Sequence, residues 1–236
     1  MAHIEREAHP ILTLFGLLVI GVVLTIFGGT VWTAPLEILI VFFHEAAHAL
    51  MTVVTGGRVV EMAVTIDQGG HVISAGGNRF LILTAGYLGS LLIGAALLVA
   101  GMRSKHDRAI LLALGVLVAL ITVFFVRNMF GIAYGLLAAA LMIGIARLLP
   151  EIASDYTLRL IGVMSLLYVP ADIFSDTIDR SHLHSDARML AEEFGGTTML
   201  WGGLWLSMSA AMVVISLLIG LRRRRRLPST IGQPSL

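Results

Sequence analysis

Two histidines and one glutamate form the motif with the clearest chemical meaning in this sequence. The stretch FFHEAAHAL places His44 and His48 four residues apart, with Glu45 directly after the first histidine. Residues four apart on an α-helix lie on one face, one turn of rise from each other, so both imidazoles can reach the same metal ion. A carboxylate beside that ion can take a proton from its water, whose pKa zinc lowers to about 7. The motif therefore predicts His44 and His48 as metal ligands and Glu45 as a general base for hydrolysis.

The motif lies inside an apolar run, which strengthens this interpretation. The helix expected over residues 34–54 begins near Ala34, so at about 1.5 Å per residue His44 lies roughly 15 Å along it. That depth is the middle of a hydrocarbon layer about 30 Å thick, where a charged side chain costs about 3 kcal/mol or more. A bound dication would compensate the imidazoles and the carboxylate together. The alternative is that both histidines are buried packing residues, satisfied by backbone carbonyls or by each other.

The absence of cysteine narrows the ligands that a metal could use. The chain of 236 residues has no cysteine and eight histidines, which excludes thiolate sites and leaves His, Asp and Glu as ligands. A hydrolytic zinc ion has three protein ligands and one open position. The third ligand must therefore come from another part of the chain. We expect His71, His182 and His184 to be solvated loop residues rather than ligands.

The composition is that of a polytopic membrane protein. Hydrophobic residues make up 57% of the chain and charged residues 13%, and the mean hydropathy of +0.91 lies outside the range of soluble domains. A count of six transmembrane helices is the alternative to seven, because the fifth apolar run is short and only RNMF separates it from the fourth. The expected fold class is all-α, in one membrane-embedded domain over residues 1–226 followed by a flexible tail over 227–236. Apolar runs of about 20 residues mark the seven expected helices, near residues 10–29, 34–54, 80–101, 109–126, 131–146, 158–174 and 199–221.

Two polar connections carry secondary structure of their own. Residues 57–79 alternate apolar and polar side chains around a paired-glycine turn, which predicts a β-hairpin after the second helix. The polar loop over residues 175–198 contains an expected short amphipathic helix over residues 185–194, with Ser185 as N-cap and Gly195 at its end. Both segments are expected to lie outside the hydrocarbon.

The basic residues predict an orientation in the membrane. Five arginines at residues 222–226 follow the last apolar run, and MRSKHDR at 102–108 follows the third. Because basic loops gather on the cytoplasmic side, we expect the pentaarginine tail in the cytoplasm, on the anionic lipid of the cell membrane. With seven spans the same rule places the hairpin outside. No nucleic-acid signature accompanies the arginines, so the expected partner is the lipid bilayer.

The order of motifs resembles that of a known protein family. FHEAAHAL in an apolar run, a glycine-rich hairpin and AGYLGS in the next run are similar to the site-2 protease family of intramembrane zinc metalloproteases, in its small branch without a PDZ domain. DIFSDTIDR and SDA resemble that branch too, so the similarity covers residues 35–100 and 165–205. The resemblance implies one zinc ion, metalloendopeptidase activity and membrane-spanning protein substrates cleaved within the bilayer, as in regulated intramembrane proteolysis. It also implies a cytosolic hairpin, opposite to the charge rule, and both orientations stay open at this point.

The resemblance implies an aspartate from a later helix as the third zinc ligand. Family members carry it in an Asn-x-x-Pro…Asp-Gly pattern, whereas this chain has LYVPADIFSDTIDR without Asp-Gly. Asp172 is the expected ligand, because it lies in the sixth apolar run close behind Pro170. Asp176 shares a helical face with Asp172 and is the second candidate, either as the ligand or as a carboxylate that orients a histidine. The alternative is that both aspartates end the span in water.

The predicted hairpin offers a way to hold an unwound substrate. A helical substrate shields its own amides, so water cannot attack before the helix opens locally. An edge strand captures an extended segment by β-addition, and we expect a strand within residues 59–66 to do so near the metal. The resemblance gives Asn128 a role in holding substrate or an oxyanion, with a short interfacial turn as the alternative. The small residues of AGYLGS predict a close helix contact, which the resemblance places against the helix of His44.

Two other function classes fit the same ligands. A divalent-metal transporter or channel needs ligands on several helices and a polar pathway, yet the fourth and fifth apolar runs hold almost no polar residue. A non-catalytic metal-bound scaffold would keep the ligands for stability alone, yet the motif is intact. An intramembrane zinc endopeptidase is therefore the leading hypothesis.

Overall fold

A computed structural model of the chain describes residues 33–180 and 184–221, with a few single positions between 15 and 30. The first predicted span, over residues 10–29, lies almost entirely outside these stretches, and so does the predicted tail. The described residues are mostly helical and form six helices that are long and apolar enough to cross a membrane. They also form one antiparallel hairpin. The predicted fold class is thereby confirmed.

The described elements follow the predicted order. The fifth predicted run is a full-length helix, and the sixth helix begins at residue 151 rather than 158. Its first turns are polar, and there the Arg159 guanidinium both pairs with Asp155 and donates to the Gly101 carbonyl at 3.0 Å. The elements are α2 (Ala34–Val54), β1 (Arg58–Val64), β2 (Gly70–Ala75), α3 (Arg79–Arg103), α4 (Asp107–Phe125), α5 (Met129–Leu148), α6 (Glu151–Phe174), the π-helical turn η1 (Ser175–Asp179), α7 (Asp186–Phe194) and α8 (Thr198–Leu221).

Local sequence explains where the first two described helices begin and end. α2 has Pro35 in its first turn, where the missing N–H has no helical partner to lose. It ends at Thr55, and Gly56 follows with φ +84°, a left-handed conformation that favours glycine. α3 begins after Asn78, whose side chain accepts a hydrogen bond from the Leu81 amide at 3.1 Å. These signals place the hairpin between the two helices.

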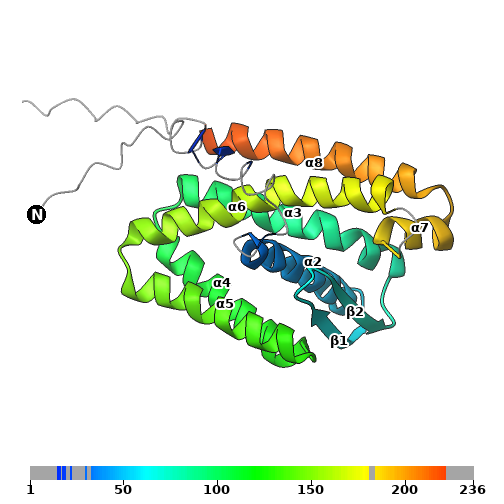
Figure 1. The fold of residues 1–236 in the computed structure, drawn as a ribbon, viewed down its shortest axis with the longest axis horizontal. Helices are drawn as coiled ribbons and strands as arrows, with labels where there is room; N and C mark the ends of the chain where they lie inside the picture. Colours follow the sequence, from blue (N-terminus) through cyan, green and yellow to red (C-terminus); the bar gives the residue numbers. More distant parts are fainter. Residues whose placement is uncertain are drawn as a thin grey trace, which may run out of the picture.

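Helix α3 lies at the centre of the bundle and contacts α2, α6 and α8 (Figure 1). Small residues allow these contacts to be close. A Cβ at Gly94 would lie 2.1 Å from the Ser165 Cβ of α6, and one at Gly162 would lie 2.6 Å from the Leu98 amide nitrogen of α3. Helices α4 and α5 form a helical hairpin that packs on α6.

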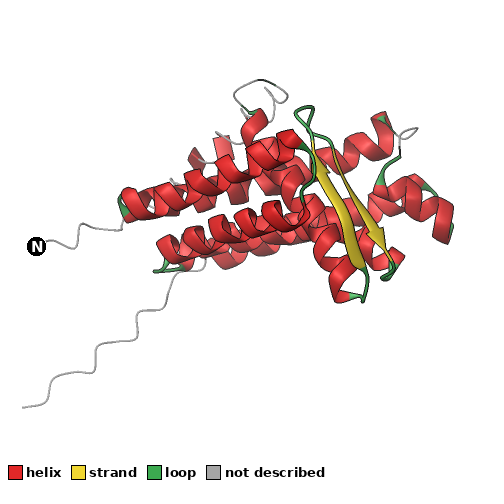
Figure 2. Cartoon of the chain, turned by 90° about the horizontal axis from the view of Figure 1, so that it is seen from below, coloured by secondary structure: helices red, strands yellow, loops and turns green. Residues whose placement is uncertain are grey.

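The predicted β-hairpin is confirmed after α2, and its strands lie over the helices at one end of the bundle (Figure 2). β1 and β2 pair antiparallel, from Arg58 opposite Ala75 to Val64 opposite Gly70. β2 begins next to the middle of α2, and the strand can come this close to Glu45 because Gly70 has no side chain.

The connection between α4 and α5 extends the sheet beyond β1. Met62 forms a parallel bridge with Val126, and the Arg127 amide donates to the Met62 carbonyl at 3.0 Å. Asn128 then accepts from the Val64 amide at 3.3 Å and donates to the Val64 carbonyl at 2.7 Å. The outer edge of β1 is therefore occupied by residues 126–128.

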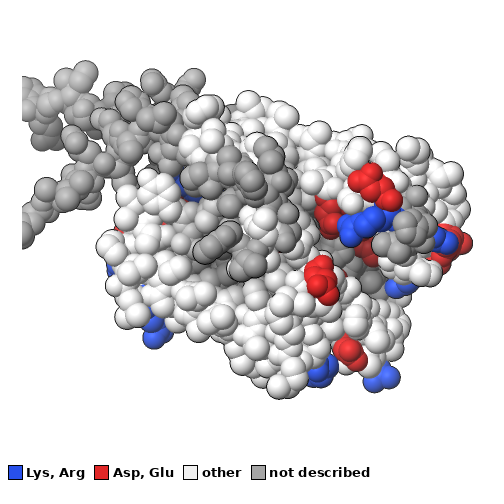
Figure 3. All heavy atoms as spheres, in the orientation of Figure 1, with Lys and Arg blue, Asp and Glu red and all other residues white. Residues whose placement is uncertain are grey.

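The two ends of the helical bundle differ in what they carry. The hairpin and α7 lie at one end (Figure 1). At the other end, the Arg103 guanidinium of α3 donates to the Ile219 carbonyl of α8, and Arg108 donates to the Leu149 carbonyl, each at 2.8 Å. Charged side chains are sparse on the face between the ends (Figure 3). The last residue of α3 thus lies beside the last turn of α8, at the same end of the bundle.

Candidate metal centre

Helix α2 presents the H-E-x-x-H motif to the interior of the bundle. His44 is the eleventh of its 21 residues, in the middle of the helix. Glu45 and His48 are buried, and His44 is half-buried. As their spacing predicts, the two imidazoles meet on one face, with ring centroids 4.6 Å apart and Nε2 atoms 2.9 Å apart.

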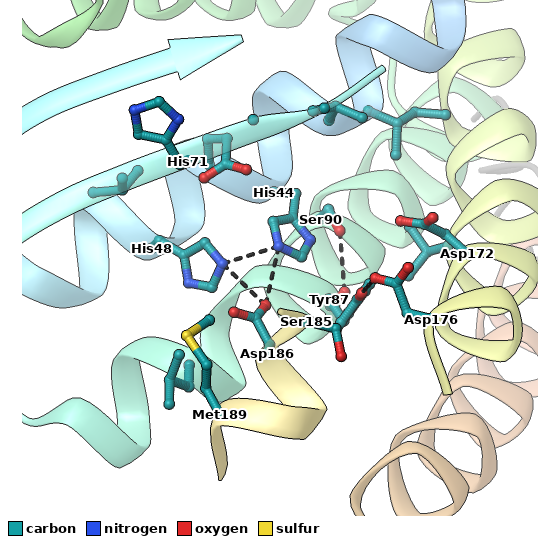
Figure 4. A pocket seen from close by; sticks show the side chains of 18 of the residues that line it. His44, His48, His71, Tyr87, Ser90, Asp172, Asp176, Ser185, Asp186 and Met189 are labelled. Atoms are coloured by element: carbon teal, nitrogen blue, oxygen red, sulfur yellow. Dashed lines mark hydrogen bonds and ion pairs between the residues drawn. The ribbon is translucent and has the colours of Figure 1, made fainter. Parts of the chain in front are cut away.

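The carboxylate that meets these imidazoles belongs to Asp186, the first residue of α7. Its Oδ2 atom lies 3.1 Å from the Nε2 atom of His44 and 3.1 Å from that of His48. In the described part of the chain, this is the one group of three His, Asp or Glu side chains whose atoms lie close enough to share a metal ion. Figure 4 shows Asp186 reaching from α7 toward both rings. These three candidate metal ligands are named the ligand group.

Helix α7 holds Asp186 in place and matches the helix predicted over residues 185–194. Ser185 is its N-cap, and Gly195 ends it with φ +86°. Asp186 occupies the first turn, where free amides and the helix dipole favour a negative charge. Arg79 of α3 pairs with Glu193 of α7 at 3.1 Å, which ties the short helix to the bundle.

The donor chemistry of the ligand group fits a metal ion. His48 Nδ1 lies 2.6 Å from the Ile82 carbonyl of α3. Because a carbonyl only accepts, Nδ1 carries a proton. In its neutral form the ring therefore turns the lone pair on Nε2 toward Asp186, which is the form that a metal ligand needs. Asp186 Oδ2 is buried without a hydrogen bond of good geometry, although two Nε2 atoms lie 3.1 Å away. Acceptors that converge in this way need a cation between them.

The distances within the ligand group support the same assignment. Its three atoms are separated by 2.9, 3.1 and 3.1 Å. Ligand atoms around a tetrahedral zinc ion, at bond lengths near 2.0–2.1 Å, lie about 3.3 Å apart. A carboxylate binds a metal in its ionised form, and a bound dication would supply the positive charge that the buried Asp186 carboxylate requires.

Helix α3 approaches the ligand group at a position without a side chain. A Cβ at Gly86 would lie 2.4 Å from the Nε2 atoms of both His44 and His48. One turn later, a Cβ at Gly89 would lie 2.4 Å from the Ala47 Cβ. Both glycines belong to AGYLGS, so the predicted close contact between that stretch and the helix of His44 is confirmed. Gly86 also leaves free the space that a metal ion and its water would need.

The ligand group borders a cavity of about 390 Å³ that also contains Glu45. Strand β2 passes directly over this glutamate, because a Cβ at Gly70 would lie 2.5 Å from Glu45 Oε1. Figure 4 shows the strand that bears His71 crossing over His44 and His48. The H-E-x-x-H motif therefore faces a strand on one side and α7 on the other.

The two aspartates expected as third ligands line the same cavity but have other partners. Arg180 Nη2 lies 3.1 Å from Asp172 Oδ1 and 2.8 Å from Asp176 Oδ1. The Tyr87 hydroxyl donates to Asp176 Oδ2. The group that could hold a metal ion thus contains Asp186, whereas the sequence expectation was Asp172 or Asp176. The reason is that the turn η1 directs both carboxylates toward Arg180, whereas α7 begins beside α2.

The sequence expectations give Asp186 no role, although two signals pointed to it. The tripeptide SDA, residues 185–187, is part of the family resemblance, and Ser185 is a predicted helix cap. An acidic residue directly after an N-cap has a fixed direction at the start of a helix, unlike one inside a loop. What the sequence lacks is any sign that this short helix docks against α2.

Two of the remaining polar candidates, Asn128 and His71, have structural partners. The Asn128 side-chain amide forms hydrogen bonds with both the N–H and the C=O of Val64. These bonds favour a structural role in the turn between α4 and α5 over the binding of substrate. His71 pairs with Glu61 across the hairpin at 3.5 Å. His184 is exposed at the rim of the cavity, and His182 lies outside the described residues.

Comparison with known proteins identifies one family. The family model described as Peptidase M50B-like, within the site-2 protease family, matches residues 13–216 of the chain. The match includes α2, α3 and α7, and with them all three members of the ligand group. Neither the curated proteins nor the solved structures contain a match to the chain.

Proposed function

This chain belongs to the Peptidase M50B-like family, and we propose that it is an intramembrane zinc endopeptidase that hydrolyses peptide bonds of membrane-spanning proteins. Family membership supports a multi-pass membrane metallopeptidase; the choice of zinc and the internal cleavage of membrane-spanning substrates are the proposal's own. The observation that carries it is the convergence of His44, His48 and Asp186 within 2.9–3.1 Å at the middle of a membrane-length helix.

In the proposed mechanism each residue has a distinct task. His44, His48 and Asp186 would hold one zinc ion, which supplies a Lewis acid and lowers the pKa of water. Glu45 takes a proton from the attacking water and gives it to the leaving amine. The Ile82 carbonyl keeps His48 in the tautomer that binds metal. Gly86 keeps the space beside the ligands free.

The same structure gives less support to metal transport. A transported ion moves between successive groups of polar ligands along a pathway. Within residues 33–180 and 184–221, one such group of three His, Asp or Glu side chains is found. An ion bound there has no second group of this kind in the described bundle to pass to, so catalysis is the better account of the ligand group.

The decisive variant is Glu45→Gln. It keeps the size of the side chain and the three ligands but removes the base, so we expect bound zinc to stay near one ion per chain while cleavage falls by at least about 10²–10⁴-fold. Metal content of the purified full chain and cleavage of a membrane-spanning reporter in liposomes measure the two effects. Glu192→Gln is the matched control, because Glu192 is half exposed and pairs with Arg188 on α7. Undiminished cleavage by Glu45→Gln would remove the proposed mechanism.

The strand edge available to an unwound substrate belongs to β2, whereas the expectation had chosen β1. Residues 126–128 occupy the outer edge of β1 at Met62 and Val64. In an antiparallel pair, alternate residues bond to opposite sides. Val72 lies opposite Met62, and Gly70 lies opposite Val64. The backbone N–H and C=O groups of Val72 and Gly70 therefore point away from β1. Both line the cavity that contains Glu45.

We propose that a substrate segment pairs with β2 at this edge by β-addition, which places its backbone above Glu45. Val72→Pro removes one outward amide without touching the ligand group, so cleavage should fall by more than about tenfold while zinc binding stays unchanged. Val60→Pro is the control, because Val60 is a half-exposed residue at the irregular part of β1. If the two variants cleave the reporter equally, the β2 edge is not the substrate's binding strand.

The domain boundaries and orientation are proposed as predicted. One membrane-embedded domain over residues 1–226 would end in the pentaarginine tail on the cytoplasmic face of the cell membrane. Support comes from Arg103, the last residue of α3, which lies beside the last turn of α8. A reporter fused after residue 236 should be accessible only from the cytoplasm; labelling from outside would reverse the orientation.

A further inference from the structure

The two histidines of the ligand group are held in different ways. His48 has a backbone carbonyl 2.6 Å from its Nδ1 atom, which fixes both the tautomer and the ring angle. No such hydrogen bond to His44 Nδ1 is found among the described residues. Instead the Tyr87 ring stands against the His44 ring, with centroids 4.6 Å apart and planes at 80°. The direction of the His44 imidazole thus depends on where Tyr87 lies.

Tyr87 is itself fixed from three sides. It follows Gly86, whose close approach to the ligand group sets the position of the α3 backbone there. Its ring is buried, at 3% exposure, and packs on Trp205 of α8 with centroids 5.2 Å apart. Its hydroxyl donates to Asp176 Oδ2. Of these constraints, the hydrogen bond of the hydroxyl is the one that can be eliminated by deleting a single oxygen atom.

Asp176 is held by the end of α6. It lies in the π-helical turn η1, an irregularity that is frequent at functional sites. Arg180 Nη2 lies 2.8 Å from its Oδ1 atom, and Arg180 is anchored in turn by hydrogen bonds to the Ser175 hydroxyl at 3.1 Å and the Ser175 carbonyl at 2.8 Å. The carboxylate therefore has one oxygen on Arg180 and the other on Tyr87.

We propose that Asp176 is a positioning residue that acts through Tyr87 to hold the His44 imidazole in its metal-binding direction. Figure 4 shows Tyr87 between Asp176 and His44, so the three side chains form a continuous series from η1 to the ligand group. The inference rests on the proposed function, because it concerns how one ligand of the metal is oriented. Outer partners of metal ligands change metal affinity by about 10–100-fold, and an indirect partner belongs at the lower end of that range.

The test uses Tyr87→Phe in the full chain purified in detergent micelles. This variant keeps the ring against His44 and removes only the hydroxyl. We expect the dissociation constant for Zn²⁺, measured by chelator competition, to rise about tenfold, and the visible absorption bands of the Co²⁺-loaded protein to shift. Tyr134→Phe is the matched control, because its hydroxyl donates to the Pro35 carbonyl at the start of α2, away from the cavity.

A double variant separates positioning from general loss of structure. If Asp176 acts through the Tyr87 hydroxyl, then Asp176→Ala in the Tyr87→Phe background adds little to the loss of Zn²⁺ affinity. With Tyr87 intact, Asp176→Asn, whose amide oxygen can still accept the hydrogen bond, keeps most of the affinity that Asp176→Ala loses. Additive losses, or a Tyr87→Phe protein with wild-type affinity and Co²⁺ spectrum, would overturn the inference while the wild type still binds metal. A wild type that binds neither ion would refute the proposed function itself and this inference with it.

Discussion

Two groups of carboxylates face the same cavity, and they differ in what neutralises them. Asp186 meets two imidazoles whose nitrogen atoms converge with its oxygen at 2.9–3.1 Å. Asp172 and Asp176 instead share one guanidinium, that of Arg180. Burial by itself lowers the pKa of Arg180, but the carboxylates of Asp176 and Asp172 outweigh it and raise the pKa, so its charge is permanent.

The difference shows which carboxylate is available to a metal. An arginine beside a carboxylate already neutralises its charge, so a metal ion would have to compete with a cation that the chain itself supplies. Neutral imidazoles leave the negative charge of Asp186 without a full counter-charge. An acidic residue in a membrane protein is therefore a better ligand candidate when its neighbours are histidines than when one of them is arginine.

The largest expected effect is loss of the metal on removing Asp186. Asp186→Ala should weaken Zn²⁺ binding by more than about 100-fold, since loss of an outer partner alone costs about 10–100-fold. Asp172→Ala, the ligand expected from sequence, should bind Zn²⁺ within about tenfold of wild type. Metal content after gel filtration in detergent distinguishes the two. If both variants lost Zn²⁺ equally, Asp186 would not differ from Asp172 as a metal ligand.

A smaller effect is expected from filling the space beside the first group. The methyl group of Gly86→Ala would lie 2.4 Å from both Nε2 atoms, so α3 must shift and we expect Zn²⁺ affinity to fall by about tenfold or more. Gly203→Ala on α8 is the control, because a Cβ there meets nothing within 4 Å. Chelator competition measures both. Normal metal binding by Gly86→Ala would show that the ligands need less room than the structure indicates.

The smallest effect is expected from Arg180→Gln. Its side chain is 47% exposed, so loss of its ion pairs should lower the free energy of unfolding by only about 0.5–1 kcal/mol. Zn²⁺ affinity should change less than in Asp186→Ala, because Arg180 reaches the ligand group only through Asp176 and Tyr87. Thermal unfolding of the apo-protein and chelator competition test this order. A complete loss of metal would mean that the two carboxylate groups act as one.

Local patterns explain which parts could be predicted from sequence. Apolar runs, the paired-glycine turn and the Ser185 cap are each determined by residues close in the chain, and the described helices, the hairpin and α7 follow them. His44 and His48 meet because residues four apart in an α-helix lie on the same face. These predictions needed no knowledge of which helix packs on which.

The parts that were not predicted depend on long-range docking. Asp186 reaches His44 only because α7 packs against α3, through contacts such as Arg79 with Glu193. The free strand edge lies on β2 only because Asn128, far along the chain, covers Val64. Neither contact leaves a periodic or compositional trace, so the sequence led to Asp172 and to β1, whereas the structure leads us to propose Asp186 and β2.

The order of the ligands along the chain has a consequence for biosynthesis. Two come from α2 and the third from α7, so a nascent polypeptide that has inserted α2 through α6 still lacks a complete set. If these three side chains bind the metal as proposed, such a precursor would bind it weakly and would not hydrolyse neighbouring proteins. Activity would then arise only with the short helix before the final span, when membrane integration is almost finished.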